Sequence, residues 1–566
     1  MRLATILVSL PAVLALWPQP SSLSLGKGTL WIEENIKFEI ENPEAWKRRS
    51  GTPVGLPTDL EIIENSIKTT KNAIFQQNFV PWKFHPRNAS YEPPMSPKQT
   101  ISKVSIRQAT SKSKNPPTEN KSMDEYYALS VTANGDVEIS SSTGIGILRA
   151  LTTMSQLFYS HTKGGKYTPF APVVVRDSPK FEHRGLNLDV ARNYYPVRSI
   201  THLIDTMSTN KLNKLHLHIT DSQSWPLEIP SLPDLAAKGA YSPGLVYTPN
   251  DIREIQLHGA LRGVDVFLEI DMPGHTSSIY YAYPELISSF NVQPEWTSFA
   301  LEPPSGTLKL NSSKVDTFLE KVLADLSPRI SPYTNYFHTG GDEVSQSAYL
   351  RDETVKTSEQ LKLRPHMARF IKRNHDQLRK AGLTPIVWQE MLTEWMLPME
   401  KDVVVQAWQG GSAVNLITQQ GHKAIAGNQE NWYLDCGQGD WLNPSGGKNS
   451  YPFTGCSPRK NWRMVYTYDP LDQVDAKNHH LVIGGEAHIW SEQIDHINMD
   501  PVVWPRASAA AEVLWSGPRD ANGKDRDIQE AAIRLSEFRE RMVAMGVMAE
   551  PIQMPFCLQE PHQCDG

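Results

Sequence analysis

The sequence has few cysteines, no excess of basic residues and no apolar run long enough for a membrane span. Its 566 residues include 56 Lys and Arg against 62 Asp and Glu, so the formal net charge is −6. That balance argues against a nucleic-acid partner, because dedicated nucleic-acid-binding proteins normally carry a basic excess. A composition of 39% hydrophobic and 21% charged residues excludes disordered, collagenous and multi-span membrane proteins. A globular protein remains.

Cysteine is scarce: the chain has four, and no two of them stand in the C-x-x-C spacing of metal sites. They form two close pairs in sequence, Cys436 with Cys456 and Cys557 with Cys564. In an oxidising compartment two local disulfides are the simplest of the three possible pairings. A disulfide that closes the loop from Cys436 to Cys456 would stabilise the fold by about 3 kcal/mol. Four free buried thiols are the alternative, and neither a metal nor a cofactor is expected.

The N-terminus has the layout of a secretory signal peptide over residues 1–15. Arg2 precedes a mainly apolar stretch, residues 3–14, which is followed by the small residue Ala15. This stretch is too short for a bilayer span, which takes about 20 residues. A buried N-terminal helix is the alternative. We therefore expect a secreted, extracellular protein with no membrane partner.

Three N-x-[ST] sequons are compatible with passage through a glycosylating secretory pathway. They lie at Asn88, Asn120 and Asn311. A chain of this length carries some sequons by chance, so they support export only weakly.

Residues 16–176 predict a smaller α+β domain. Short alternating apolar runs at 29–40 and 126–142 are typical of strands, and the second run contains an NGD turn. Residues 142–159 instead place their apolar side chains at helical spacing. Residues 81–121 are rich in Pro, Ser, Asn and Lys, so we expect a long polar surface loop there that a protease can reach.

Residues 177–566 alternate β-rich apolar runs with amphipathic helical stretches. Such runs, separated by helices, are typical of a parallel sheet that is buried on both faces. Eight of them predict an α/β fold, a (β/α)8 barrel that forms the catalytic domain. A doubly wound open sheet is the structural alternative. The eight runs are 185–190, 215–220, 264–270, 336–340, 385–390, 403–408, 423–428 and 481–487.

The residues that follow these strands are mainly tryptophans and carboxylates, together with one arginine. In a barrel of this kind the site lies at the C-terminal ends of the strands. Tryptophan faces stack on sugar rings, and carboxylates and arginine bind hydroxyl groups, so carbohydrate is the expected ligand. In chain order these residues are Arg192, Asp221, Trp225, Asp271, His275, Asp342, Glu343, Trp388, Glu390, Trp408, Trp432, Tyr433, Asp435, Trp490 and Glu492.

The segment YFHTGGDEVS, residues 336–345, is the most informative. It places Asp342 and Glu343 side by side after a buried strand and two glycines. Two carboxylates so close cannot both ionise easily, so one pKa is expected to rise into the range of a general acid. A solvated surface pair is the alternative, because most acidic residues are exposed. The position at the end of a strand favours the catalytic interpretation.

The chain resembles a known family through several motifs in order. They are GLNLDVARNYYP, KLNKLHLHITDSQSWP, FLEIDMPGHTSS, HTGGDEV, IVWQEM, ENWYLDCGQG and VIGGEAHIWSE. Together they resemble the family 20 glycoside hydrolases, the β-N-acetylhexosaminidases, and are most similar to secreted fungal members. The resemblance covers nearly the whole chain, and a homodimer is a further expectation that comes with it.

The resemblance implies retaining hydrolysis assisted by the substrate, one of the exceptions to the two-carboxylate scheme. The 2-acetamido oxygen of the substrate is then the nucleophile. Glu343 is implied as the general acid and base, and Asp342 as the group that orients the acetamido N–H and stabilises the developing positive charge. Tyr433 is implied as the hydrogen-bond partner of the acetamido oxygen.

The remaining site residues are also implied by the resemblance. Three tryptophans resemble the aromatic cage around the acetamido methyl group: Trp388, Trp408 and Trp490. Three residues resemble those that bind the 3-, 4- and 6-hydroxyls of the terminal sugar and so make the cleavage exo: Arg192, Asp435 and Glu492. Three more are implied as supports that hold the acid pair and tune its pKa: Asp221, Asp271 and His275.

Three other functions compete with this interpretation. The string formed by His216, His218 and Asp221 suggests a metal hydrolase, but both histidines point to the same face of a strand, below its end. A non-catalytic glycan-binding protein would keep the pocket but would have no use for the acid pair. A double-displacement glycosidase would use the two acids as proton donor and nucleophile. His338 is interpreted as a packing residue of its strand.

Overall fold

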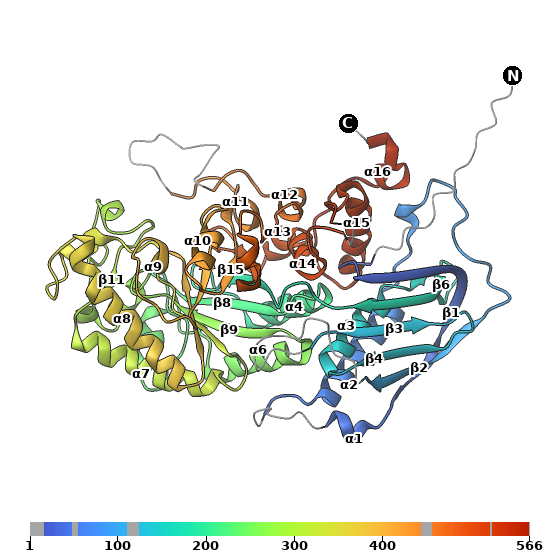
Figure 1. The fold of residues 1–566 in the computed structure, drawn as a ribbon, viewed down its shortest axis with the longest axis horizontal. Helices are drawn as coiled ribbons and strands as arrows, with labels where there is room; N and C mark the ends of the chain where they lie inside the picture. The colour runs from blue at the N-terminus through green and yellow to red at the C-terminus, as the bar shows by residue number, and fades with distance from the viewer. Residues whose placement is uncertain (1–15, 48–54, 110–123, 443–455, 521–522, 565–566) are drawn as a thin grey trace.

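A computed structural model describes residues 16–47, 55–109, 124–442, 456–520 and 523–564 (Figure 1). The predicted signal peptide and the sequon at Asn120 lie outside these residues. The other two sequon asparagines, Asn88 and Asn311, are exposed, and their glycosylation stays a prediction. The four cysteines form two local disulfides, one from Cys436 to Cys456 and one from Cys557 to Cys564.

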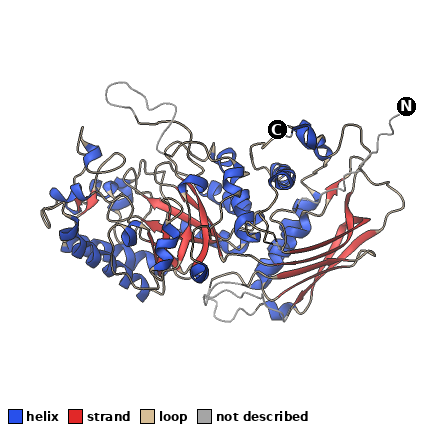
Figure 2. Cartoon of the chain, turned by 45° about the horizontal axis from the view of Figure 1, so that its top comes forward, coloured by secondary structure: helices blue, strands red, loops and turns tan. Residues whose placement is uncertain are grey.

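The N-terminal part is a six-stranded sheet with helices on one face (Figures 1 and 2). The strands run in the order β1-β2-β4-β3-β6-β5. Their bounds are β1 (Ser22–Ile40), β2 (Thr100–Gln108), β3 (Tyr127–Val131), β4 (Val137–Ser141), β5 (Tyr159–Ser160) and β6 (Lys166–Asp177). The longer helices are α2 (Asp59–Phe75) and α3 (Gly144–Ser155), which pack on each other, and α2 also contacts the barrel.

The prediction of a polar loop over residues 81–121 is wrong for part of that segment. Strand β2 lies inside this segment and pairs in parallel with β1 on one side and β4 on the other. Its buried Ile101, Val104 and Ile106 belong to the core of the sheet. Exposed residues such as Lys103 and Arg107 alternate with or follow them and make the segment polar in sequence, and only the pairing with distant strands shows which face is buried.

The second part is the predicted barrel, which is closed and has eight strands in the order β12-β13-β14-β15-β16-β7-β8-β9. Closure excludes the doubly wound open sheet. The strands are β7 (His183–Asp189), β8 (Lys214–Thr220), β9 (Asp265–Ile270), β12 (Tyr336–His338), β13 (Thr384–Trp388), β14 (Val404–Ala407), β15 (Ala424–Ala426) and β16 (Val482–Ile489). The domain boundary that we propose, between residues 176 and 177, falls at the end of β6.

Helices surround the barrel (Figures 1 and 2). The main ones are α4 (Val197–Thr209), α6 (Pro249–Arg262), α7 (Ser313–Ile330), α8 (Gln360–Lys380), α14 (Arg506–Ser516) and α15 (Ile528–Ala544). Helix α6 shows how the local sequence sets their ends. Thr248 and Asp251 form a capping box at its start, and Gly263, at φ 66°, adopts the left-handed conformation that ends it.

The barrel interior has one apolar layer and a polar zone. Six residues fill the apolar layer: Phe267, Tyr336, Ile386, Val404, Ile425 and Ile483. The polar zone consists of buried polar and charged residues, at positions where the interior of such a barrel usually has branched apolar side chains. It contains His183, His216, His218, Glu269, His338, Gln406, Glu486 and His488. These residues lie on the strands whose ends carry the predicted site.

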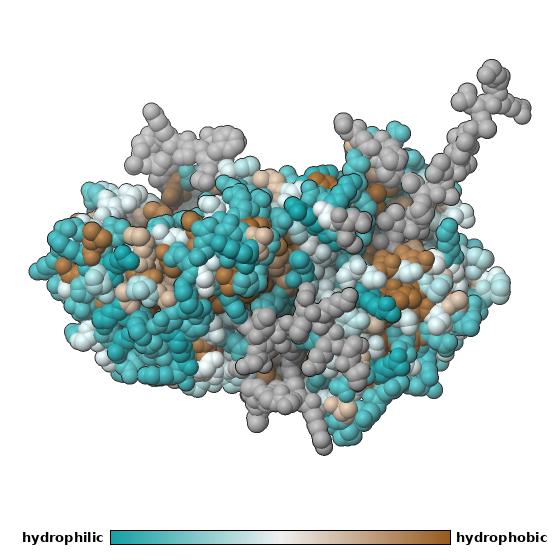
Figure 3. All heavy atoms as spheres, viewed as in Figure 1, coloured by the Kyte–Doolittle hydropathy of each residue, from teal (hydrophilic) through white to brown (hydrophobic). Residues whose placement is uncertain are grey.

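Hydrophilic residues cover most of the face seen in Figure 3, and hydrophobic residues are scattered over it. Among the residues that the structure describes, no helix is both long and apolar enough to cross a bilayer.

Buried ion pairs join the sheet to the barrel. The Glu125 carboxylate accepts hydrogen bonds from Arg149 of α3 at 2.8 Å and from Arg184 of β7 at 2.6 and 2.7 Å. Nearby, the Lys211 ammonium lies 2.9 Å from the Asp177 carboxylate. All five side chains are buried, so removing one partner leaves a buried charge without its counter-ion.

The first prediction concerns this connection. Glu125→Gln is expected to lower the free energy of unfolding by about 3 kcal/mol or more, because Arg149 and Arg184 stay buried without their carboxylate. Glu39→Gln is the matched control, since Glu39 pairs with Lys103 at 3.2 Å on the exposed face of the sheet. The control is expected to change the unfolding free energy by less than about 1 kcal/mol. Denaturant titration followed by tryptophan fluorescence measures both, and equal effects would contradict the prediction.

Candidate active site

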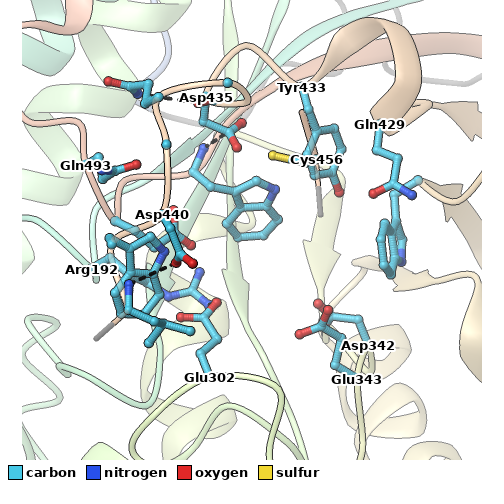
Figure 4. A pocket seen from close by; sticks show the side chains of 18 of the residues that line it. Arg192, Glu302, Asp342, Glu343, Gln429, Tyr433, Asp435, Asp440, Cys456 and Gln493 are labelled. Carbon is cyan, nitrogen blue, oxygen red and sulfur yellow. Dashed lines mark hydrogen bonds and ion pairs between the residues drawn. The ribbon is translucent and has the colours of Figure 1, made fainter. Parts of the chain in front are cut away.

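A cavity of about 540 Å³ opens at the C-terminal ends of the barrel strands (Figure 4). It is lined by side chains that come from most of the βα connections. Nine of the residues predicted from sequence contribute to its wall: Arg192, His275, Asp342, Glu343, Trp408, Tyr433, Asp435, Trp490 and Glu492. The barrel thus brings together residues that are as much as 300 positions apart (492 − 192 = 300).

Six of the fifteen predicted strand-end residues are not part of the cavity wall, and all six are buried: Asp221, Trp225, Asp271, Trp388, Glu390 and Trp432. Asp221 and Asp271 are buried behind it. Trp388 is only 1% exposed and packs against Trp490, with ring centroids 6.0 Å apart. The predicted cage of three tryptophans is therefore two tryptophans and Tyr433 on the wall, with Trp388 behind them.

The cavity also contains residues that the sequence did not single out. Glu302 lies in the long connection between β9 and α7, far along the chain from the ends of the barrel strands. Our prediction considered only residues close to strand ends, so it missed Glu302. The other unpredicted wall residues include Gln429, Asp440, Trp441 and Gln493.

The acid pair stands on a strained turn after β12. Gly340 has φ 63°, and a Cβ atom there would lie 1.7 Å from Asp271 Oδ1, so only glycine fits. Gly341 donates its N–H to Asp271 Oδ1 at 2.7 Å. Glu343 itself has φ 51°, a conformation that costs a non-glycine residue about 1 kcal/mol and that is common at functional sites. The turn aims Asp342 and Glu343 into the same cavity (Figure 4).

Burial changes the protonation of the two aspartates at this turn. It raises the pKa of Asp342, although the nearby His275 opposes the rise. Burial, and then the charge of Asp342, raise the pKa of Asp271 well above its usual range. The rise is larger for Asp271 than for Asp342, so within this pair Asp271 favours the protonated form more strongly.

His275 connects the acid pair to Asp221. Its Nε2 atom lies 3.4 Å from Glu343 Oε2 and 3.9 Å from Asp342 Oδ2, while its Nδ1 atom lies 3.1 Å from Asp221 Oδ1. Burial acts to lower the pKa of His275, but the surrounding carboxylates outweigh it and raise the pKa well above its usual range. His275 is therefore a cation that faces both acids.

Arg192 forms the opposite end of the cavity. Its Nη2 atom lies 2.9 Å from Glu302 Oε1 and 3.0 Å from Asp221 Oδ2, and its Nη1 atom lies 3.3 Å from Asp189 Oδ2. Burial would lower the pKa of Arg192, but these carboxylates raise it further, so the guanidinium stays charged. A fixed cation with acidic neighbours is suited to binding hydroxyl groups.

Two acids of the cavity wall have strongly raised pKa values. Burial, and then the charge of Glu492, raise the pKa of Asp435 to about 8. Burial, and then Glu302, raise the pKa of Glu492 to about 8, against the opposing effect of Arg192. Protonated carboxyls can donate hydrogen bonds as well as accept them, which suits them to neutral hydroxyls.

The aromatic wall lies between these two ends. Trp408 and Tyr433 have ring centroids 6.3 Å apart, and the indole N–H of Trp408 donates to Glu390 Oε1 at 2.9 Å. Burial raises the pKa of the Tyr433 phenol well above its usual range, so its O–H remains a donor. Cys456 also lies on this wall, which ties the wall to the disulfide with Cys436 (Figure 4).

The histidines of the metal-hydrolase alternative are engaged in ion pairs. His216 lies 3.0 Å from Glu269 and 3.1 Å from Glu486, and His218 lies 2.6 Å from Glu269 and 2.8 Å from Asp221. His216, Glu269 and His338 hold potential ligand atoms within 4.8 Å of one another. The ring nitrogens of His216 and His218 thus already face carboxylates, an arrangement typical of an ion-pair network.

Comparisons with known proteins match most of the chain to one family. Residues 181–518 match the family model for the glycosyl hydrolase family 20 catalytic domain, and residues 16–157 match a model described as beta-acetyl hexosaminidase like. A beta-hexosaminidase of Arthroderma benhamiae is 43% identical, with 97% of each chain covered. The human beta-hexosaminidase subunit beta is 30% identical and covers 96% of this chain and 90% of its own.

Solved structures show the same fold. The chitobiase of Flavobacterium johnsoniae has a TM-score of 0.71 and 24% identity over 94% of this chain and 73% of its own. A β-N-acetylhexosaminidase of Streptomyces coelicolor has a TM-score of 0.68 and 22% identity over 96% and 98%.

Proposed function

Because the chain belongs to glycosyl hydrolase family 20 and is a β-N-acetylhexosaminidase, we propose that it removes terminal nonreducing sugars by substrate-assisted, retaining hydrolysis. The sugars are N-acetylglucosamine and N-acetylgalactosamine, released from β-linked glycans and chitooligosaccharides. One observation carries the proposal: Asp342 and Glu343 face a cavity whose wall is aromatic at one side and bears Arg192 with three carboxyl groups at the other.

The proposed reaction uses the two acids for different tasks. Glu343 protonates the oxygen of the departing group, and the acetamido oxygen attacks the anomeric carbon to give a cyclic oxazolinium ion. Asp342 accepts a hydrogen bond from the acetamido N–H and stabilises the positive charge that develops. Glu343 then takes a proton from the water that opens the ring. Tyr433 donates its O–H to the acetamido oxygen and directs it.

The rest of the cavity binds the terminal sugar. Trp408, Trp490 and Tyr433 enclose the acetamido group and the ring, with Trp388 behind them. Arg192, Asp435 and Glu492 hydrogen-bond the 3-, 4- and 6-hydroxyls. Because these residues close one end of the cavity, only a terminal sugar fits, and the cleavage is exo.

We also propose that the enzyme acts outside the cell. Two local disulfides support this, because such bonds persist mainly in oxidising compartments. The homodimer remains a prediction, which the mass of the purified enzyme in solution tests.

The test of the mechanism is inhibition by a thiazoline analogue of the cyclic intermediate. We expect this compound to bind the enzyme at least 100-fold more tightly than N-acetylglucosamine, because transition-state-like analogues exceed substrates by about 10² or more. The first product seen by NMR should be the β-anomer. A double-displacement enzyme would also retain the anomer, but the thiazoline would inhibit it weakly. A glycan-binding protein would release no sugar from aryl hexosaminides or chitobiose.

A further inference from the structure

A line of alternating carboxylates and imidazoles runs from the cavity into the barrel. It begins with Glu343 and His275, continues through Asp221, and reaches His218, whose Nε2 atom lies 2.8 Å from Asp221 Oδ2. The Nδ1 atom of His218 then lies 2.6 Å from Glu269 Oε2. Both His218 and Glu269 are buried, and neither lines the cavity.

The second oxygen of Glu269 serves the aromatic wall. Glu269 Oε1 accepts the indole N–H of Trp388 at 2.7 Å and lies 3.0 Å from Nδ1 of His338. Trp388 in turn packs against Trp490, which lines the cavity. One buried carboxylate therefore contacts both the support of the acid pair and the support of the sugar-binding wall.

The geometry defines the charge of each group in the line. Each ring nitrogen of His218 faces a carboxylate oxygen, so both must carry hydrogen, and the ring is an imidazolium. Burial favours the neutral form of Glu269, but His338, His218 and His216 outweigh it and hold its pKa well below its usual range. Arg192, His275 and His218 likewise hold the pKa of Asp221 well below its usual range, against the effect of burial.

We infer that Glu269 and His218 are positioning residues for the reaction proposed above. Through His218, Glu269 holds Asp221 and His275 in the orientation that presents His275 to Glu343. Through Trp388, it holds the wall against which the acetamido group folds. The inference rests on the proposed function, because it assigns these residues to the proton transfer and the acetamido participation of that mechanism.

Other groups also face this pair, and they define what a test must separate. Glu269 is surrounded by His216 and His218 of β8, His338 of β12 and Trp388 of β13. Asp271, on the same segment as Glu269, contributes a nearby titrating group. His218 faces Asp221 and the ring of Trp490, whose centroid is 5.0 Å away.

A second buried glutamate supplies a matched control. Glu486 accepts contacts from His183 at 2.6 Å, His216 at 3.1 Å and Gln406 at 2.9 Å, deep in the same barrel. It contacts neither His218 nor Trp388 in the described structure. Glu486→Gln therefore removes a buried anion of the same kind without touching either support.

The experiment compares Glu269→Gln, His218→Gln and Glu486→Gln with two aryl N-acetyl-β-glucosaminides. For the phenyl substrate, Glu269→Gln is expected to lower kcat by roughly 10- to 100-fold with little change in KM, as a misplaced catalytic group does. The loss should be smaller for the dinitrophenyl substrate, whose leaving group departs without a proton. His218→Gln should show the same leaving-group dependence, and both variants should shift the pH profile of kcat.

The thiazoline separates the two tasks of Glu269. Its affinity should fall in Glu269→Gln, which loses the carboxylate charge behind Trp388, and should stay close to the parent value in His218→Gln. Glu486→Gln should keep the kcat, leaving-group dependence and pH profile of the parent enzyme. If Glu269→Gln does not fold, His218→Gln tests the support of the acid pair by the same readouts.

The outcomes distinguish the inference from the function it rests on. Equal losses in Glu269→Gln and Glu486→Gln, with no leaving-group dependence, would overturn the positioning role. So would a His218→Gln variant with the kinetics of the parent enzyme. A parent enzyme that the thiazoline does not inhibit would instead overturn the proposed mechanism, and this result requires no variant.

Discussion

Glu343→Gln is expected to reduce hydrolysis of a phenyl N-acetyl-β-glucosaminide by roughly 10³-fold or more, at the upper part of what general acid–base catalysis contributes. The amide keeps the size of the side chain but has no acidic proton to give to the departing oxygen. It also cannot accept the proton of the attacking water. KM should change little, because the hydroxyl-binding residues at the far end of the cavity are untouched.

Two measurements make this result specific. A dinitrophenyl substrate should recover much of the rate of the first step, because its leaving group needs no proton. Glu394→Gln is the matched control, since Glu394 lies on the exposed side of the same rim and is not part of the cavity wall. We expect the control to retain the activity of the parent enzyme. A Glu343→Gln variant with more than a tenth of the parent kcat on the phenyl substrate would contradict the assigned role.

Asp342→Asn is expected to lower kcat by about 10²- to 10³-fold, the cost of removing one preorganised group that stabilises charge in a transition state. Asp342 is the member of the pair that faces the cavity, and its pKa is raised less than that of Asp271. Asparagine can still accept a hydrogen bond from the acetamido N–H, but it offers no charge to the forming oxazolinium ion. The affinity for the thiazoline should therefore fall with kcat.

The leaving group distinguishes the two variants. Because Asp342 acts on the nucleophile, the loss in Asp342→Asn should be the same for phenyl and dinitrophenyl substrates, whereas the loss in Glu343→Gln should not. Asp440→Asn is a control at the exposed rim of the same cavity and should change kcat by only a few-fold. Unchanged turnover in Asp342→Asn would reject its role. A covalent adduct on Asp342 would instead support double displacement.

Much of the fold was predictable because its signals are local. All eight barrel strands appear in sequence as short β-rich apolar runs, and α4 and α6 appear as amphipathic stretches between them. Strand β2 was missed because Lys103 and Arg107 on its exposed face make the segment polar in sequence, and because its partner strands β1 and β4 lie far from it in the chain. Polar strands of this kind are recognisable only from the sheet that they complete.

The candidate site was predictable to a similar degree. Residues at strand ends, such as Asp342 and Tyr433, follow from barrel geometry together with the motifs that contain them. Glu302 does not, because it comes from a long connection whose path depends on tertiary packing. Trp388 was expected on the cavity wall, but Glu269 draws its indole N–H into the barrel.

The sequence by itself determined the eight-stranded barrel, the order of the residues around its mouth and the adjacent acids Asp342 and Glu343. These features depend on the periodicity of apolar residues and on which residues are neighbours in the chain, and both can be read from the amino-acid sequence. Only the tertiary structure decided which carboxyls have raised pKa values and that Glu269 connects His218 with Trp388. Protonation and ion pairing depend on burial and on distances of a few ångströms between residues far apart in the chain. The few cysteines and the near balance of charge thus indicated only a globular protein. The role of each charged side chain depends on the folded barrel.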